Sequence, residues 1–331
     1  MIIREKAYAR AGLIGNPSDG YFGKTISFRI KNFCAEVTLY ETPEIEILPT
    51  ERDHCTYSDI NALVHDINRF DYYGGVRLIK AAIKRFADYC REKKVPLPKK
   101  NFTVRYNSNI PQHVGMAGSS AIITATFLSL MKFYDVKIDK EILPNLILSV
   151  ETVELKLAAG LQDRVIQVYG GLVYMDFNRE LMTATGHGRY ESLPLDRLPK
   201  LYVAYRQDLA EVSDVVHSNL RSRFDSGDPV IHNAMKFFAS ITDQAKAVLL
   251  GTSDLDLGTL MNSNFDKRCE IMHISEPNMK MVQLARSTGA TAKFTGSGGA
   301  IVGTYKNEEM FDNLSDILNK ENIAIFKPEI I

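Results

Sequence analysis

The sequence predicts a mixed α+β fold, because segments with strand periodicity and segments with helix periodicity interleave along the chain. The chain has 331 residues, 45% of them hydrophobic, so it can bury a sizeable core in one large or two medium domains. We find neither internal repeats nor low-complexity tracts in it. These observations favour an ordinary globular α+β protein over a repeat array or a disordered chain.

The first half of the chain alternates between the two periodicities. Val104, for example, lies in a half-buried pattern of alternating residues, whereas Ile123, Phe127 and Leu130 recur at helical spacing. The elements expected here are strands near 26–40 and 102–108, helices near 74–93, 120–134 and 141–157, and a strand near 171–177. Glycine and proline then mark residues 186–199 as the linker-like stretch, which predicts lobes of residues 1–195 and 196–331.

The second half begins with a strand and is then mostly helical. Leu201 to Tyr205 is an apolar run of strand length, and near the C-terminus Met310, Leu314 and Leu318 share one helix face. The elements expected after 201–205 are helices near 211–224, 230–250, 255–272 and 277–287, a strand–loop–strand pair around 291–304, the helix carrying Met310, and a last strand at 322–326.

Charge and cysteine content exclude several classes of function. Forty basic residues balance forty acidic ones, so no global field draws the chain to nucleic acid or to an anionic membrane. The four cysteines are far apart and form no C-x-x-C pair, which argues against a zinc knot or a disulfide scaffold. The N-terminus lacks a signal-peptide core, and no apolar run approaches the roughly 20 residues of a membrane span. We expect a cytoplasmic protein that binds any anion locally; its oligomeric state stays open between monomer and dimer.

The segment 109–121, NIPQHVGMAGSSA, is the most informative part of the chain. It is a glycine-rich, serine-bearing turn between a predicted strand and a predicted helix. Helix N-termini attract anions through unpaired N–H groups and the positive end of the macrodipole, and glycine allows close approach of the backbone to phosphate. The residues expected to bind phosphate are Gly115, Met116, Ala117, Gly118, Ser119, Ser120 and Ala121. A serine cap after a glycine turn is the alternative interpretation.

Two further segments decide between these interpretations. Residues 9–19 read ARAGLIGNPSD, and residues 293–300 read KFTGSGGA. With 109–121 between them, the three segments resemble, in order and spacing, the three motifs of the GHMP superfamily of small-molecule kinases. The resemblance is greatest to the plant-type glucuronokinase branch, through Gly15 to Asp19, residues 159–171 and the third segment, and it covers roughly residues 4–305. It implies a two-lobed fold with the active site in the cleft between the lobes.

The resemblance also implies catalytic residues. Asp163 matches the catalytic aspartate, which orients or deprotonates the acceptor hydroxyl, and Arg10 matches the basic residue expected beside it. Glu151 lies about a dozen residues earlier, where the family places its magnesium-binding glutamate, and Glu154, one helical turn on, is the second candidate. From the residues alone, Asp163 could be a helix N-cap, Arg10 a surface ion pair and each glutamate an exposed helix charge.

The same resemblance assigns residues to the acceptor side. Asp19 aligns with a carboxylate that binds sugar hydroxyls in some members, although an Asx-turn would also explain it. Arg164 and Arg206 are candidate cations for a carboxylate on the sugar, although each could be a surface ion pair. The residues expected in or beside the acceptor site are Asp19, Asn16, Gly296, Ser297, Gly298, Gly299 and Arg164. The loop 296–299 would be a simple hairpin turn if it stood alone.

The chain departs from the superfamily pattern at two places. Asn16 and Pro17 stand where Glu-His is common, and the 115–120 segment is one residue longer than Gly-Leu-Gly-Ser-Ser. Counting back from the helix selects Ser120 over Ser119 as the hydroxyl that reaches magnesium. Both departures also occur in the glucuronokinase branch, so they favour it over galactokinase or mevalonate kinase.

The function implied by the resemblance is transfer of phosphate from ATP, with Mg²⁺, to the anomeric hydroxyl of D-glucuronic acid. One alternative keeps the kinase and changes the acceptor to galactose, fucose or a heptose. Another is a non-catalytic regulator that binds a nucleotide or a sugar, although such a sensor would tolerate the loss of Arg10, Glu151 and Asp163.

Overall fold

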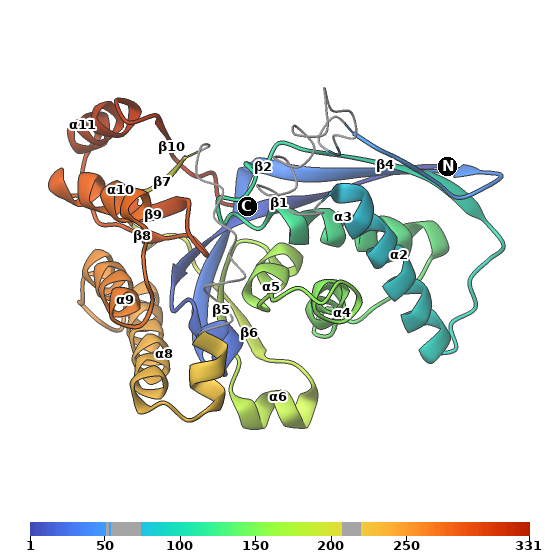
Figure 1. Ribbon diagram of the computed structural model, residues 1–331, viewed down its shortest axis with the longest axis horizontal. Helices are drawn as coiled ribbons and strands as arrows, with labels where there is room; N and C mark the ends of the chain where they lie inside the picture. The colour runs from blue at the N-terminus through green and yellow to red at the C-terminus, as the bar shows by residue number, and fades with distance from the viewer. Residues whose placement is uncertain (51–52, 54–73, 207–219) are drawn as a thin grey trace, which may run out of the picture.

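The structure is a computed structural model, and it describes residues 1–50, 53, 74–206 and 220–331. The class is α+β, as predicted, with two separate antiparallel-rich sheets among the described residues. Helices α2–α5 lie against one face of the first sheet, while α8–α11 surround the second sheet on the other side of the molecule (Figure 1). The first sheet takes strands from residues 2–193 and the second from 201–326. The division into lobes at residue 195 stays a prediction.

The first sheet is built on two long strands that run through the centre of the molecule (Figure 1). Strand β2 pairs with β1 along one edge and with β5 and then β4 along the other. The strands of this sheet are β1 (Ile2–Ile14), β2 (Lys24–Thr42), β3 (Glu46–Leu48), β4 (Asn101–Ser108), β5 (Leu172–Asp176) and β6 (Arg189–Leu193). Its helices are α2 (Gly75–Glu92), α3 (Gly118–Tyr134), α4 (Leu143–Ser149), α5 (Gln162–Tyr169) and α6 (Arg179–Thr185).

The second sheet has the strand order β10-β7-β9-β8. Its strands are β7 (Leu201–Arg206), β8 (Lys293–Phe294), β9 (Ala300–Thr304) and β10 (Ile323–Phe326), and its helices are α8 (Pro229–Leu249), α9 (Leu257–Ile271), α10 (Glu276–Ser287) and α11 (Glu308–Asn319). The side chains of Asp228, Asp256 and Asn307 accept backbone N–H bonds at the starts of α8, α9 and α11. Such caps satisfy donors that the first helical turn cannot pair internally, so local sequence fixes where these helices begin.

Most predicted elements are present, but several were missed. Strands β1 and β3 and helix α6 were not expected. The stretch 186–199 is not simply a linker, because β6 within it pairs with β5 in the first sheet. The helix expected over 141–157 leaves the α-helical path at a π-helical turn, Val150–Glu154, and ends there. The helix expected at 211–224 falls largely outside the described residues. The part of it that the structure describes begins at residue 220 and is helical to residue 225.

Two clusters of buried aromatic and aliphatic side chains stabilise the sheets. Phe28 and Phe127 are completely buried between the first sheet and its helices, whereas Tyr202, Phe265 and Leu314 pack around the second sheet. Burying one such side chain contributes roughly 1.5–3 kcal/mol, so each cluster holds its helices firmly on its sheet. The first cluster also includes residues of β7, α8 and α9, which joins the two sheets into one packed body.

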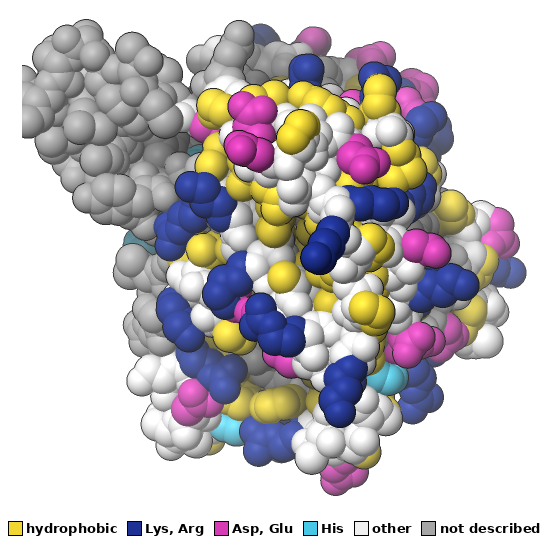
Figure 2. All heavy atoms as spheres, turned by 90° about the vertical axis from the view of Figure 1, so that its right-hand side faces the viewer, with side chains coloured by type: hydrophobic (Ala, Val, Ile, Leu, Met, Phe, Trp, Pro, Cys, Tyr) yellow, Lys and Arg dark blue, Asp and Glu magenta, His cyan; other side chains and the backbone are white. Residues whose placement is uncertain are grey.

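The surface charge is uneven although the net charge is zero. Figure 2 shows basic side chains gathered over the middle and lower left of one face, with acidic side chains mainly at its margins. No helix among the described residues meets the length and hydropathy needed to cross a membrane. The net charge of zero is therefore a sum over surface regions of opposite charge.

Candidate active site

Arg10 joins the three sequence motifs at one point. It lies on β1 and is only 5% exposed. Its Nε donates to Oδ1 of Asp163 at 2.7 Å, and its Nη1 donates to the carbonyl oxygens of Gly115 at 2.5 Å and Thr295 at 3.0 Å. Arg10 is therefore a buried ion-pair partner of Asp163 that also holds the other two loops, and the surface ion pair considered from the sequence is wrong.

Further hydrogen bonds to backbone carbonyls bring the same loops together. The N–H of Gly12 donates to the Thr295 carbonyl at 2.8 Å, and Thr295 Oγ1 donates to the Gly115 carbonyl at 3.2 Å. A Cβ at position 296 would lie 2.5 Å from the Gly115 oxygen and 2.9 Å from an Arg10 nitrogen. Only glycine fits at position 296, because any side chain would push the third loop off the second.

The segment 109–121 forms a loop followed by a helix, as predicted. Helix α3 begins at Gly118, after Ala117 in a left-handed conformation (φ 65°), and no side chain of the described residues caps it. The first N–H groups of a helix have no intrahelical partner, so those of residues 118–120 are available to an anion. The Ser120 hydroxyl is buried and donates to the Ala117 carbonyl at 3.1 Å, whereas Ser119 is partly exposed.

The two candidate metal-binding glutamates lie in different environments. Glu151 is 5% exposed, in the π-helical turn, and its carboxylate pairs with the guanidinium of Arg164. Glu154 instead pairs with Lys84 of α2 at 2.8 Å. The described residues contain no group of three or more His, Cys, Asp or Glu side chains that could hold a metal ion. Glu151 offers a carboxylate and Ser120 a hydroxyl, which are oxygen ligands of the kind that magnesium takes, and magnesium usually keeps waters and binds substrate phosphates as well.

Asp19 reaches the start of α5, where Asp163 lies. Asp163 is the second residue of α5 and not its N-cap, which is Leu161, so the capping interpretation is wrong. The Gln162 N–H donates to Oδ2 of Asp19 at 3.4 Å. Burial, and secondly the Asp163 carboxylate, raise the pKa of Asp19 to about 6. Asp19 is therefore a carboxyl group that can take up a proton near neutral pH.

Arg164 lies in a different environment from the one expected for a cation that binds the acceptor. Its side chain is 3% exposed; Nη1 donates to the Gly160 carbonyl at 2.8 Å and lies 3.4 Å from Oδ2 of Asp163, while Nη2 pairs with Glu151. Glu151, Arg164, Asp163 and Arg10 thus form a continuous row of alternating charge. Because buried charges need partners, each member of the row fixes the position of the next.

The turn after β1 is held by residues that the sequence analysis did not assign to the site. Asn264 of α9 accepts from the Gly15 N–H at 2.6 Å and donates to the Asn16 carbonyl at 3.0 Å. Arg268, one turn further along α9, donates to the carbonyls of Gly296 and Ser297 at 2.8 and 2.9 Å. Helical spacing from Met261 and Asn264 places Arg268 on the buried stripe, a signal that was available in the sequence.

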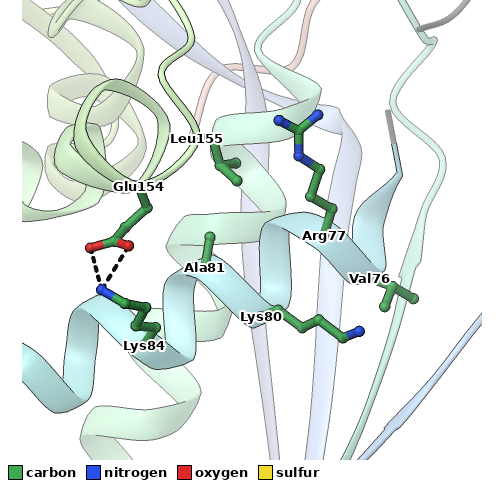
Figure 3. Close-up of a pocket in the computed structure, with 7 residues that line it drawn as sticks. All are labelled: Val76, Arg77, Lys80, Ala81, Lys84, Glu154 and Leu155. Atoms are coloured by element: carbon green, nitrogen blue, oxygen red, sulfur yellow. Dashed lines mark hydrogen bonds and ion pairs between the residues drawn. The ribbon is translucent and has the colours of Figure 1, made fainter. Parts of the chain in front are cut away.

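A hollow of about 470 Å³ lies between α2 and the residues that follow Glu151. It is lined by Val76, Arg77, Lys80, Ala81, Lys84, Glu154 and Leu155. Figure 3 shows Lys84 turned toward Glu154, with the Lys80 side chain pointing away from that pair. Three basic side chains and one acidic side chain line the hollow, which gives it a positive balance suited to an anionic ligand.

Comparison with known proteins identifies the class that this fold and site define. Residues 77–171 match the family "GHMP kinases N terminal domain". The chain is 42% identical to glucuronokinase 1 of Arabidopsis thaliana over 91% of this chain and 84% of that one, and 43% identical to probable glucuronokinase 2 of the same plant over the same shares. The chain therefore belongs to the GHMP kinases. Within them, it is a homologue of the plant glucuronokinases.

Solved structures agree on the fold. The mevalonate kinase of Methanococcus jannaschii matches with a TM-score of 0.71 at 22% identity, over 100% of this chain and 98% of that one. The galactokinase of Lactococcus lactis, crystallised with galactose, matches with a TM-score of 0.75 at 12% identity, over 99% and 93%. At these identities the likeness establishes the architecture alone.

Proposed function

We propose that this protein is an ATP- and Mg²⁺-dependent sugar kinase that phosphorylates the anomeric hydroxyl of D-glucuronic acid, giving glucuronate 1-phosphate. The observation that carries the reaction class is Arg10, whose side chain bonds Asp163, the phosphate-loop residue Gly115 and Thr295 together. The choice of acceptor rests on the identity with the two Arabidopsis glucuronokinases.

Asp163 acts on the sugar in this proposal. Its carboxylate orients or deprotonates the anomeric hydroxyl, which then attacks the γ-phosphorus while ADP leaves. Arg10, held against Asp163 at 2.7 Å, fixes the position of the carboxylate and faces the negative charge that develops on the transferred group. Phosphoryl transfer depends mainly on positioning and charge stabilisation, so a fixed pair of this kind suits it.

The nucleotide phosphates bind at the N-terminus of α3, where the N–H groups of residues 118–120 point out of the helix. Glu151 and Ser120 would hold the magnesium ion, which neutralises phosphate charge when bound. The hollow lined by Arg77 and Lys80 adjoins the turn that carries Glu151, and its size and charge support it as the place of the rest of the nucleotide.

Asp19 accepts a hydrogen bond from the sugar in its ionised form. Because its pKa is raised to about 6 in the folded protein, the ionised form predominates only above that pH. We therefore expect kcat/KM for the sugar to fall as the pH drops through about 6. Asp19→Asn should lower kcat/KM at pH about 8 by roughly tenfold or more and remove this dependence on pH. If kcat/KM of Asp19→Asn still falls below pH about 6 as in the wild type, the titrating group is not Asp19.

Acceptor selectivity tests the proposed substrate. A uronic acid carries a carboxylate that a neutral hexose lacks, so a site built for it leaves a cation unpaired when galactose binds. We expect kcat/KM for glucuronate to exceed the values for glucose and galactose at least roughly 30-fold. This ratio corresponds to a difference of ~2 kcal/mol in the free energy of transition-state binding. Galacturonate in the same panel separates recognition of charge from recognition of the ring.

Arg206 is the cation to vary in this panel. The backbone N–H of Arg206 donates to the Gly299 carbonyl at 3.0 Å, which places Arg206 beside the third loop. Arg206→Gln should reduce the preference for glucuronate over galactose, and Arg197→Gln, exposed before β7, serves as the matched control. Equal turnover of a neutral hexose would refute the uronic acid acceptor and leave the sugar kinase. Saturable binding of sugar without turnover of any sugar would instead indicate a sensor.

A further inference from the structure

Lys293 is the most unusual charged residue of the described chain. It opens the third loop on β8, is 1% exposed, and donates from Nζ to three oxygens, each at 2.7 Å. The acceptors are the carbonyls of Gly12 and Phe294 and the side-chain oxygen of Asn16. All three are neutral groups, so none of these contacts among the described residues offsets the charge of Lys293. A lysine ammonium is strongly hydrated, and its burial is unfavourable unless the surroundings require it.

The charged groups nearest to Lys293 disfavour its cationic form. Burial, followed by Arg268 of α9 and Arg10 of β1, lowers the pKa of Lys293 well below its ordinary value. Yet three acceptors at hydrogen-bond distance need three N–H donors, which only the ammonium has. A neutral amine would turn its lone pair toward one of the oxygens. The arrangement of this site thus depends on a proton that its surroundings tend to release.

The acceptors of Lys293 belong to two of the three loops that meet at Arg10. Gly12 lies near the end of β1 and Asn16 in the turn after it, both between Arg10 and Asp19, and Phe294 directly precedes Thr295, the residue whose carbonyl binds Arg10. We propose that Lys293 is a positioning residue of the proposed kinase, which in its protonated form holds the third loop in register with residues 10–19, the segment that carries Arg10 and Asp19. The inference rests on the proposed function, since the alignment of these two segments affects the rate only if the site transfers phosphate.

A methionine at this position tests the inference, because it keeps the length of the side chain and removes the donors. Lys293→Met should lower kcat at least tenfold and leave KM for ATP within about twofold, since the N-terminus of α3 is unchanged. Lys306→Met, an exposed lysine just after β9, should behave as the wild type. Amide hydrogen exchange over residues 12–16 and 295–299 should accelerate in Lys293→Met, a readout that needs no sugar.

The pH dependence of kcat distinguishes two roles of Lys293: positioning of the loops by its protonated amine, and packing by its side chain alone. In the wild type, kcat should fall on the alkaline side, at a pH below the ordinary lysine value of 10.5. Lys293→Arg, which stays charged and keeps several donors, should retain part of the activity and shift this limb to higher pH. Primary amines added to Lys293→Ala should restore turnover in proportion to the protonated amine.

Two results would overturn the inference: Lys293→Met with full kcat and unchanged exchange, or an alkaline limb that is identical in the wild type and Lys293→Arg. Absence of turnover by the wild type with every sugar would count against the proposed function. In that case the exchange rates over 12–16 and 295–299 still decide whether Lys293 joins the loops.

Discussion

Asp163→Asn should abolish nearly all phosphoryl transfer, with a loss on the order of 10² to 10⁴ in kcat, while the affinity for ATP stays close to that of the wild type. The carboxylate is bonded to Arg10 Nε at 2.7 Å and lies close enough to Asp19, the proposed sugar ligand, to raise the pKa of that group. An asparagine keeps the shape but neither the charge nor the basicity, so the sugar hydroxyl loses the group that orients it or takes its proton. The measurement is kcat with saturating ATP and sugar, beside the dissociation constant of ATP without sugar.

A matched control for Asp163→Asn is Asp312→Asn, which changes an exposed carboxylate on α11. Thermal unfolding of both variants checks that the loss of rate is not a loss of fold, because Asp163 is also the partner of a buried arginine. If Asp163→Asn retains more than about a tenth of the wild-type kcat, Asp163 is not the catalytic carboxylate.

The sequence predicted those elements whose periodicity is set by one buried face. Helices α8, α9 and α10 begin and end within about two residues of the expected bounds. Strand β1 was missed because residues 9–14 are buried on both sides and show no alternation. Strand β6 was missed for the opposite reason, since only Leu193 in it is buried and its polar sequence resembles a loop. Periodicity reveals strands that are buried on one face. It fails for strands that are buried on both faces and for strands that are buried on neither.

The site shows the same limit in its charged residues. Motif resemblance brought together Arg10, Asp163 and the loops, which the structure places in contact. It could not indicate that Lys293 is buried, because a lysine on a short strand beside a glycine-rich loop is ordinarily exposed. Nor could it indicate that Arg164 faces inward, since that orientation depends on Glu151, 13 residues away on a turn whose π-helical geometry has no sequence signature of its own. Pairing of buried charges is a property of the tertiary fold.

Glu151→Gln should have two effects that differ in origin. As the proposed metal ligand, Glu151 should be needed for magnesium, so the concentration of Mg²⁺ for half-maximal turnover should rise. As the partner of Arg164, with side chains 7% and 3% exposed, it should also stabilise the fold. Removing one partner of a buried pair costs about 3–5 kcal/mol of unfolding free energy, and Gln, which still accepts a hydrogen bond, should give a loss toward the lower end. Titration of Mg²⁺ and chemical denaturation measure the two effects separately.

A second substitution separates the two roles of Glu151. The double variant Glu151→Gln with Arg164→Met removes both charges, so the unfolding free energy should recover most of the loss, while the Mg²⁺ requirement stays raised if Glu151 binds the metal. Recovery of both quantities would mean that Glu151 serves only as the counter-ion of Arg164. Glu154→Gln is the control, because Glu154 pairs with an exposed lysine and its loss should cost no more than about 1 kcal/mol, with the Mg²⁺ requirement unchanged. If the effects of the two glutamates on Mg²⁺ are exchanged, the metal ligand lies one helical turn further along the chain.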